Sequence, residues 1–292
     1  MTSMTVTTSG FVKTIKSWLL VSPLAAILAL FLLVPVLVIV MVSFWGSTEF
    51  SYYPAFQFEN YAFLLTSSVT WSVYLQTLTF TVITWALCLL IGFTVAYFLA
   101  FHVQSLTIQI TLFLVCTIPF WTSNIIRMIS WIPFLGRNGI ANNSLQQWGW
   151  IDEPVEWLLF SDFAVILAFV HLSTLFMIVP IFNTMMRIDR SLIEAARDAG
   201  ASGRQILMHV IVPLTKPGIM IGSIFVVTLV MGDFITVRFM SGGQSASVAR
   251  MISNEVGLLQ YPAASASAVV LLLTVLLMVG AMLRMVDIRK EL

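Results

Sequence analysis

The segment 191–213 carries the densest set of side chains that could do chemistry. Glu194, Arg197 and Asp198 lie close together and Arg204 follows, whereas long apolar runs flank the segment on both sides. Carboxylates and guanidinium groups placed together could exchange protons with a substrate, or they could bind another molecule. The rest of the sequence decides between catalysis and binding.

No other residues complete a catalytic site. The sequence contains no HExxH, GxSxG or CxxC motif and no GxxxxGK[ST] loop for nucleotide phosphates. His102, His171 and His209 are scattered, and we interpret them as packed or interfacial side chains rather than metal ligands. Cys88 and Cys116 lie inside apolar runs, where thiols behave as small hydrophobic groups. The sequence therefore predicts a chain that is not an enzyme and has no metal or cofactor of its own.

The composition is that of a membrane protein. Of 292 residues, 59% are hydrophobic and only 9% are charged, whereas soluble domains carry about 25% charged residues. A net charge of +1 leaves no basic surface for nucleic acid. The first apolar run, 18–42, is too long for the core of a secretory signal, so we interpret it as an uncleaved span in contact with membrane lipid.

Hydropathy predicts an all-α fold with six transmembrane helices of about 20 residues each. The predicted spans are 18–42, 75–101, 108–126, 162–182, 218–236 and 263–284, with expected kinks at Pro35, Pro119 and Pro180. The chain then divides into an N-terminal tail (1–17), a first helix with an external loop (18–74), a transmembrane domain (75–284) with a cytoplasmic loop at about 187–217, and a C-terminal tail (285–292). A short helix is expected in the second external loop, after Asn138 and Gly139.

Positive charge predicts the orientation of these spans. With the N-terminus in the cytoplasm, the inside holds Lys13, Lys16, Arg187, Arg190, Arg197, Arg204, Lys216, Arg284, Arg289 and Lys290. The outside then holds only Arg127, Arg137, Arg238 and Arg250, which is the usual positive-inside bias. Both termini are therefore predicted to be cytoplasmic.

The cytoplasmic loop is predicted to form two short helices. The sequences SLIE (191–194) and SGRQ (202–205) both match a capping box, in which side chains satisfy the first free N–H groups of a helix. Gly200 can end the first helix with a positive φ, and Pro213 is expected to limit the second. The first helix has one face of small apolar residues, formed by Leu192, Ala195, Ala196 and Ala199, which would let another protein approach closely.

At this point the residues resemble a known motif, the EAA loop of ABC importer permeases. EAARDAG followed by VIVP fits the pattern through Glu194, Ala195, Ala196, Gly200 and Pro213, with Val210 and Val212 in place of Ile and Leu. ENYAFLL (59–65), IPFWTSNIIRMISWIPFLGRNGIANN (118–143), RIDRSLIEAARDAGAS (187–202) and GDFITVRFMSGG (232–243) are similar to the spermidine/putrescine branch. Asp233 stands where that branch often has Glu, and VRFM (237–240) stands where Pro and Leu are common.

The resemblance implies a type I importer in the cell (inner) membrane. Its parts would be two permease chains, usually different in this branch, two ATPase chains that bind ATP and Mg, and an extracytoplasmic substrate-binding protein. The EAA loop would form coupling helices that dock into a cleft on the ATPase. This chain would then be the non-catalytic permease, which transports its substrate by alternating access.

Polar groups inside spans are costly and often functional, so they identify the candidate substrate path. Asp233 is the main candidate, although it could instead end a helix or form a salt bridge. Asn124 is a weaker candidate, and its neighbour Arg127 could extend to the outer surface. Trp45 and Trp121 are the aromatic candidates, with Trp131 also worth testing, but tryptophans gather at membrane interfaces for other reasons.

A polyamine is the substrate that the resemblance implies. The predicted outer side carries more acidic than basic residues, and carboxylates with aromatic faces attract organic cations. The same machinery could carry an opine, an aminophosphonate or an iron chelate. A secondary transporter is a further alternative, although no inverted repeat is evident.

Overall fold

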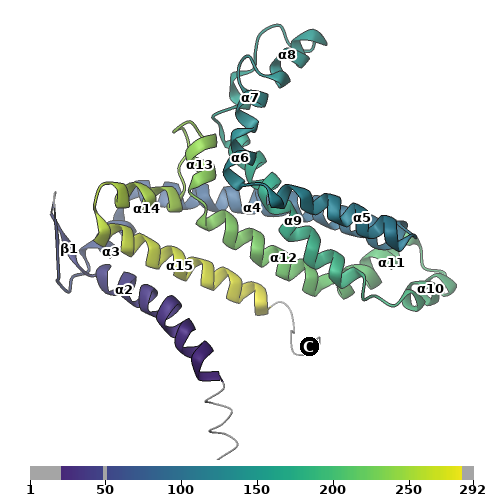
Figure 1. The fold of residues 1–292 in the computed structure, drawn as a ribbon, viewed down its shortest axis with the longest axis horizontal. Helices are drawn as coiled ribbons and strands as arrows, with labels where there is room; N and C mark the ends of the chain where they lie inside the picture. The colour runs from purple at the N-terminus through teal and green to yellow at the C-terminus, as the bar shows by residue number, and fades with distance from the viewer. Residues whose placement is uncertain (1–20, 49–50, 285–292) are drawn as a thin grey trace, which may run out of the picture.

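The computed structural model describes residues 21–48 and 51–284, which fold almost entirely into helices (Figure 1). Long helices run alongside one another and form an elongated bundle. The single hairpin of the described residues pairs β1 (Gly46–Ser47) with β2 (Tyr52–Tyr53) in antiparallel register. The all-α class predicted from hydropathy is confirmed.

The described chain contains short helices between the long apolar ones. They are η1 (Ala29–Leu33), α2 (Val34–Val42), α3 (Glu59–Thr66), α4 (Ser68–Tyr97), η2 (Phe98–His102), α5 (Leu106–Thr117), η3 (Ile118–Trp121), α6 (Asn124–Ile129), α7 (Trp131–Leu135), α8 (Ile140–Gln147), η4 (Glu156–Leu158), α9 (Asp162–Met185), α10 (Arg190–Asp198), α11 (Gly203–Ile206), η5 (Leu207–Ile211), α12 (Val212–Gly232), α13 (Ile235–Met240), α14 (Val248–Gly257) and α15 (Tyr261–Arg284).

Five helical stretches of the described chain are long and apolar enough to cross a membrane. They are Val21–Val42, Ser68–His102, Glu156–Met185, Gly203–Gly232 and Tyr261–Arg284. A sixth span results only if Leu106–Trp121 and Asn124–Gln147 are counted together, and these two stretches meet at an angle of 91°. The predicted tails, 1–17 and 285–292, lie outside the described residues.

The third predicted span, 108–126, is wrong as one continuous helix, because the helix stops before Asn124. Pro119 starts a tight 3₁₀ turn, and both the N–H and the Oγ1 of Thr122 donate to its carbonyl, at 3.3 and 2.8 Å. Thr122 then turns to an extended conformation, with φ −96° and ψ 150°. The polar Thr122 and Ser123 thus break an apolar run that hydropathy alone treats as uninterrupted.

The fifth predicted span, 218–236, is wrong at its C-terminal end. The helix already runs from Gly203, and it ends at Gly232 because Asp233 adopts an extended conformation, with φ −89° and ψ 115°. Pro213 therefore lies inside the helix instead of limiting it. The π-helical turn η5 lies immediately before this proline region, and such a local widening accommodates a residue that has no N–H to donate.

The core of the bundle is α9, which packs against both α4 and α12. Small residues allow the close approach: a Cβ on Gly218 would lie 2.5 Å from the Pro180 carbonyl oxygen, and one on Gly222 would lie 2.7 Å from the Met177 sulfur. The same methionine lies against Gly92 of α4. The GxxxG pattern at 218–222 thus serves packing within this chain, as small residues do between membrane helices.

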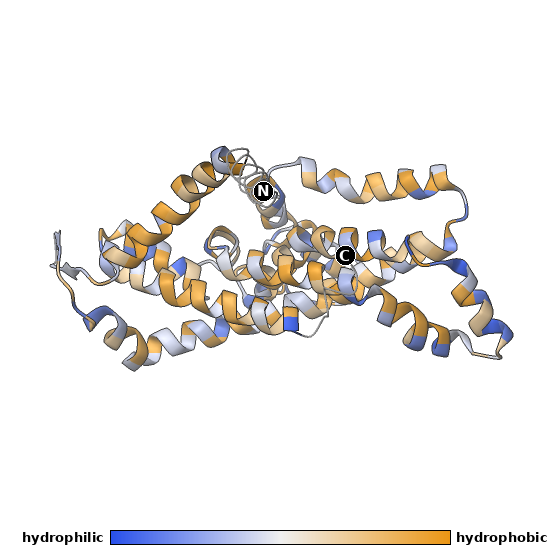
Figure 2. Cartoon of the chain, turned by 90° about the horizontal axis from the view of Figure 1, so that it is seen from below, coloured by the Kyte–Doolittle hydropathy of each residue, from blue (hydrophilic) through white to orange (hydrophobic). Residues whose placement is uncertain are grey.

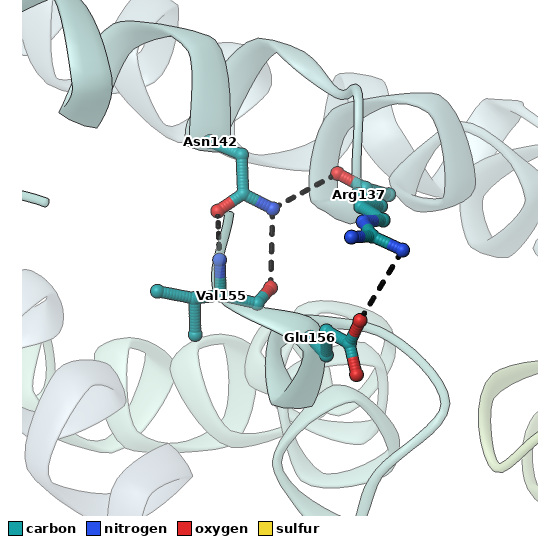
Figure 3. Close-up of polar contacts among 5 residues, drawn as sticks. Arg137, Asn142, Val155 and Glu156 are labelled. Atoms are coloured by element: carbon teal, nitrogen blue, oxygen red, sulfur yellow. Dashed lines mark hydrogen bonds and ion pairs between the residues drawn. The ribbon is translucent and has the colours of Figure 1, made fainter. Parts of the chain in front are cut away.

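The segment α6–α8, here called the arm, begins against α9 and α13 and leads away from the bundle (Figure 1). The predicted helix after Gly139 is present as α8. Figure 3 shows how Asn142, which is fully buried, fastens this helix to the returning chain: its Nδ2 donates to the carbonyls of Gly136 and Val155, and its Oδ1 accepts from the Val155 N–H. The arm is therefore held in shape by its own hydrogen bonds.

Apolar residues cover the long helices, whereas polar residues gather at one end of the bundle, where α10 lies (Figures 1 and 2). The stretch Val21–Val42 shows the apolar surface most clearly, since none of its most apolar window is buried within the described chain. It contacts α15 at the edge of the bundle. Such a surface requires lipid or another apolar chain around it.

Candidate functional site

Two helix breaks meet at a cavity of about 400 Å³, here called the Asp233 cavity. One break precedes α6 and the other separates α12 from α13, and α6 and α13 contact both each other and α9. The cavity wall combines aromatic and polar residues: Phe120, Phe169, Phe176, Phe234, Asn124, Ser173, Thr228 and Asp233. Membrane transporters use such interrupted helices to present polar groups to a ligand.

Asp233 has two roles in this arrangement. Its Oδ1 accepts from the Thr236 N–H at 2.9 Å, and its Oδ2 accepts from the Thr236 hydroxyl at 2.7 Å. The first of these bonds satisfies one of the free N–H groups at the start of α13, so the carboxylate does hold a helix end. Among the described residues it forms no salt bridge. Because each carboxylate oxygen accepts more than one hydrogen bond, Asp233 keeps acceptor capacity for a ligand in the cavity.

Asn124 lines the same cavity from the first turn of α6. Its Oδ1 accepts a hydrogen bond from the guanidinium of Arg127, one turn further along. Arg127 is only 8% exposed, so it does not extend to the surface as one sequence interpretation allowed. The structure thus brings two predicted path residues, Asn124 and Asp233, to one cavity.

The tryptophan candidates lie elsewhere. Trp45 is half-buried in the hairpin region and stacks on Tyr52 at 6.0 Å between ring centroids. Trp121 is 79% exposed and is absent from the cavity wall, although Phe120 beside it does line the cavity. Trp131 belongs to a neighbouring cavity, where it donates to His171 Nδ1 at 3.0 Å.

Sequence reasoning missed the phenylalanines that form most of the aromatic wall. They lie in apolar runs, where a core residue and a path residue look alike. Two weaker signals were present: Phe234 follows Asp233 directly, and Ser173 is a hydroxyl within the run 162–182. Ser173 is almost completely buried, as expected for a small polar group enclosed between helices.

The loop between α9 and α12 forms two capped helices, as expected, but the first cap differs. Asp189 is the N-cap of α10 and accepts from the Ser191 N–H at 2.9 Å, so Ser191 and Glu194 do not form the predicted capping box. This hydrogen bond from the Ser191 backbone lowers the pKa of Asp189. The second box is confirmed: Gln205 Oε1 accepts from the Ser202 N–H at 2.8 Å, and the Gln205 N–H returns to Ser202 Oγ at 3.4 Å.

Gly200 joins the two helices with φ +83°, in the left-handed region, as predicted. A Cβ there would meet no atom within 4 Å, so the position requires glycine for its backbone conformation and not for space. The N–H groups of Gly200 and Ala201 donate back to Arg197 and Ala196, which closes the end of α10.

The two faces of α10 have different surroundings. Leu192, Ala195 and Ala199 are exposed, and we call this set the docking face. Ile193 and Ala196 pack against the core, so Ala196 does not belong to the exposed face as predicted. The helical repeat separates the two groups, which places them on different sides of one short helix.

The charged residues of α10 lie on a further side of this helix, next to a cavity. Arg190, Glu194 and Arg197 border a cavity of about 300 Å³ between this helix and the end of α4, which Tyr97 and His102 also line. Within the described chain, none of these three charges forms an ion pair. Glu194 therefore faces the crevice beneath α10 and lies apart from the docking face.

Comparison with known proteins places these features in a family. No family model matches the chain. The chain is 33% identical over 253 residues to the spermidine/putrescine transport system permease protein PotB of Salmonella typhimurium, covering 86% of this chain and 87% of that protein. It is 34% identical over 232 residues to PotB of Haemophilus influenzae, covering 78% and 79%.

A solved structure has the same fold. In the crystal structure of a bacterial alginate ABC transporter in complex with an alginate pentasaccharide-bound periplasmic protein, one chain superposes with a TM-score of 0.74 at 18% identity, covering 92% of this chain and 94% of that one. The fold and the sequence relationship agree along most of the chain. This protein is a member of the ABC importer permease family that includes the PotB proteins.

Proposed function

We propose that this permease carries polyamines of the spermidine/putrescine type into the cytoplasm. The observation that carries the proposal is the Asp233 cavity, where one carboxylate and four phenylalanines meet at the breaks of two spans. The relatives at 33–34% identity are spermidine/putrescine permeases, which supports the same choice.

The chemistry of the cavity suits an alkylammonium group. An ammonium donates hydrogen bonds that the Asp233 carboxylate can accept, and aromatic faces attract a cation with about 0.5–2 kcal/mol per contact. The remaining wall is apolar, including Ile125, Met128 and Leu172, and suits methylene segments. A volume of about 400 Å³ is in the range of small-molecule sites.

The assembly that we propose has parts that this chain does not supply. An ATPase dimer would bind ATP and Mg and receive the docking face, a second, homologous permease chain would complete the path, and an extracytoplasmic binding protein would deliver the polyamine. The exposed small residues of α10 support the first contact, because Ala195 and Ala199 let another backbone approach closely. The protein would lie in the inner membrane with both termini in the cytoplasm, as the positive-inside bias suggests.

Coupling would proceed through the helix that starts at the docking loop. A single helical stretch, Gly203–Gly232, leads from α11 to the edge of the Asp233 cavity. When the ATPase closes on ATP, a displacement of α10 and α11 would move this helix against α9 and open the cavity to alternate sides. We therefore assign Glu194, Ala195, Ala196, Gly200 and Pro213 to coupling, and Asp233 and Asn124 to the path.

The test is uptake of radiolabelled spermidine by proteoliposomes that contain the whole transporter and its binding protein. Asp233→Asn is the informative variant, because Asn can still cap α13 but carries no charge. Glu153→Gln, an exposed carboxylate of the external loop, is the matched control. Uptake should fall about tenfold or more in the first variant and stay unchanged in the second. Equal uptake by Asp233→Asn would refute the assignment of the cavity.

A further inference from the structure

Arg127 is a buried guanidinium without an acidic partner. It is 8% exposed, its Nη2 donates to Asn124 Oδ1, and its Nε has no acceptor within the described chain. No carboxylate of the described residues forms an ion pair with it. Burying a charge in this way is costly, so the position calls for an explanation beyond packing.

Among the described side chains, Asn124 is the one that accepts a hydrogen bond from Arg127. Arg127 lines a cavity of about 380 Å³ together with Trp131 and His171. Trp131 Nε1 donates to His171 Nδ1 at 3.0 Å, so that ring nitrogen is already used as an acceptor and the hydrogen of a neutral imidazole lies on Nε2. The other ring nitrogen of His171, Nε2, can therefore only donate a hydrogen bond. Within the described chain, the amide oxygen of Asn124 is the side-chain acceptor to which the guanidinium is bonded.

This pairing also determines what Asn124 presents to the Asp233 cavity. A guanidinium has only donors, so it must bind the oxygen of the amide and not the nitrogen. The Asn124 NH₂ group is then the part that remains for the cavity. A donor at this position cannot accept a hydrogen bond from an ammonium group, whereas Asp233 can.

We infer that Arg127 is a positioning residue that fixes Asn124 as a donor, so that Asp233 and not Asn124 accepts hydrogen bonds from an ammonium group of the substrate in this cavity. The inference rests on the proposed polyamine transport. A di- or triamine would then be held by one end, which keeps its binding weak enough for release. Without Arg127, the Asn124 oxygen could turn to the cavity and become a second acceptor for an ammonium.

The test is equilibrium binding of radiolabelled spermidine to the purified transporter without its binding protein, together with uptake in proteoliposomes. Arg127→Met removes the charge and the donors while preserving an apolar side chain of similar length. It should lower the Kd for spermidine about threefold to tenfold, the effect of one added hydrogen bond, and slow uptake. A merely structural loss would weaken binding instead.

A double-mutant cycle shows whether Arg127 acts through Asn124. In an Asn124→Ala background, Arg127→Met should change the Kd by less than about twofold, because no amide oxygen is left to turn. Arg127→Lys, which can still donate, should restore the original Kd. Arg127→Gln is measured in parallel, so that the result does not depend on one variant assembling. Arg137→Met, on the same arm but exposed and paired with Glu156 at 3.4 Å, is the matched control and should bind normally.

Two results would overturn the inference: weaker spermidine binding by Arg127→Met, or a tightening that persists when Asn124 is Ala. Asp233→Asn is included to separate this inference from the proposed function. If Asp233→Asn abolishes spermidine binding but the effects of the Arg127 and Asn124 substitutions on the Kd simply add, only the role assigned to Arg127 is wrong. If wild-type transporter does not bind spermidine, the proposed substrate itself is wrong.

Discussion

The Asp233 cavity and the charged side of α10 differ in where their polar groups find partners. In the cavity, Asp233 bonds to Thr236 and Asn124 bonds to Arg127, each within one helical turn. On α10, Glu194 and its neighbouring arginines have no ion-pair partner in the described chain. The cavity is thus organised by this chain alone, whereas the α10 region has charges and an apolar face still available to another molecule.

This difference has consequences for mutation. If the proposed coupling is right, changes at the α10 end of the bundle should affect assembly and coupling while the cavity keeps its affinity. Changes within the bundle should alter stability or substrate binding while the docking face stays intact. Mutation can therefore separate these two kinds of effect.

The largest effect is expected at the centre of the docking face. Ala195→Arg places a long charged side chain on the face that we propose contacts the ATPase, and we expect uptake to fall about 30-fold or more, because central interface positions contribute about 2 kcal/mol or more. Copurification of the ATPase should be lost, while spermidine binding to the permease pair stays normal. Ala195→Ser, which stays small, is the control. Full ATPase recovery with Ala195→Arg would show that this face is not the docking site.

The next effect is expected at Gly200. Val in place of Gly200 must adopt the φ of +83°, a left-handed conformation that costs a side-chain-bearing residue about 1–2 kcal/mol. The joint between α10 and α11 should shift, and substrate-stimulated ATP hydrolysis should fall about tenfold although the chain still inserts. Gly203→Ala is the control, since Gly203 has an ordinary φ and open space around its Cα. Unchanged ATP hydrolysis with Gly200→Val would contradict a coupling role for this joint.

A smaller effect, on stability, is expected where α12 meets α9. A side chain at Gly222 would press on Met177, so Gly222→Ala should destabilise the protein by about 1–3 kcal/mol through overpacking. Gly280→Ala in α15 has no atom within 4 Å and should be neutral or stabilise by about 0.5–1 kcal/mol. Thermal unfolding of both purified variants provides the comparison. Equal shifts would mean that the α9–α12 contact is looser than described.

Local rules explain which features could be predicted from the sequence. Gly200 and the Ser202 capping box depend on a few neighbouring residues, and the apolar spans depend on composition over about 20 residues. The break before Asn124 was not predicted because hydropathy averaged over about 20 residues hides the short polar run of Thr122, Ser123 and Asn124. The end of the fifth span had a readable signal, since Asp233 followed three residues later by Thr236 is a capping arrangement.

The cavity itself could be predicted only in part. Asp233 and Asn124 stood out because a polar group inside a span is unusual. The phenylalanines opposite them come from α9, from η3 and from the residue before α13, and their meeting depends on how closely Gly218 and Gly222 let α12 approach α9. Such a tertiary arrangement has no signature in a single segment of sequence.

The smallest effect is expected at the cap of α10. The Ser191 hydrogen bond lowers the pKa of Asp189 from its usual 3.8. The Asp189 carboxylate therefore stabilises the folded chain at any pH above 3.8, and this stabilisation is lost as the pH falls through the lowered pKa. The stabilisation by this cap is consequently independent of pH near neutrality, and any pH dependence of uptake near pH 7 must come from other groups. Asp189→Ala should speed amide hydrogen exchange in the first turn of α10 and reduce uptake less than about twofold, because a frayed turn leaves the docking face intact. Asp189→Asn should exchange at the original rate, since Asn is an equally good N-cap. If Asp189→Ala instead abolished uptake, the first turn of α10 would itself belong to the contact with the ATPase.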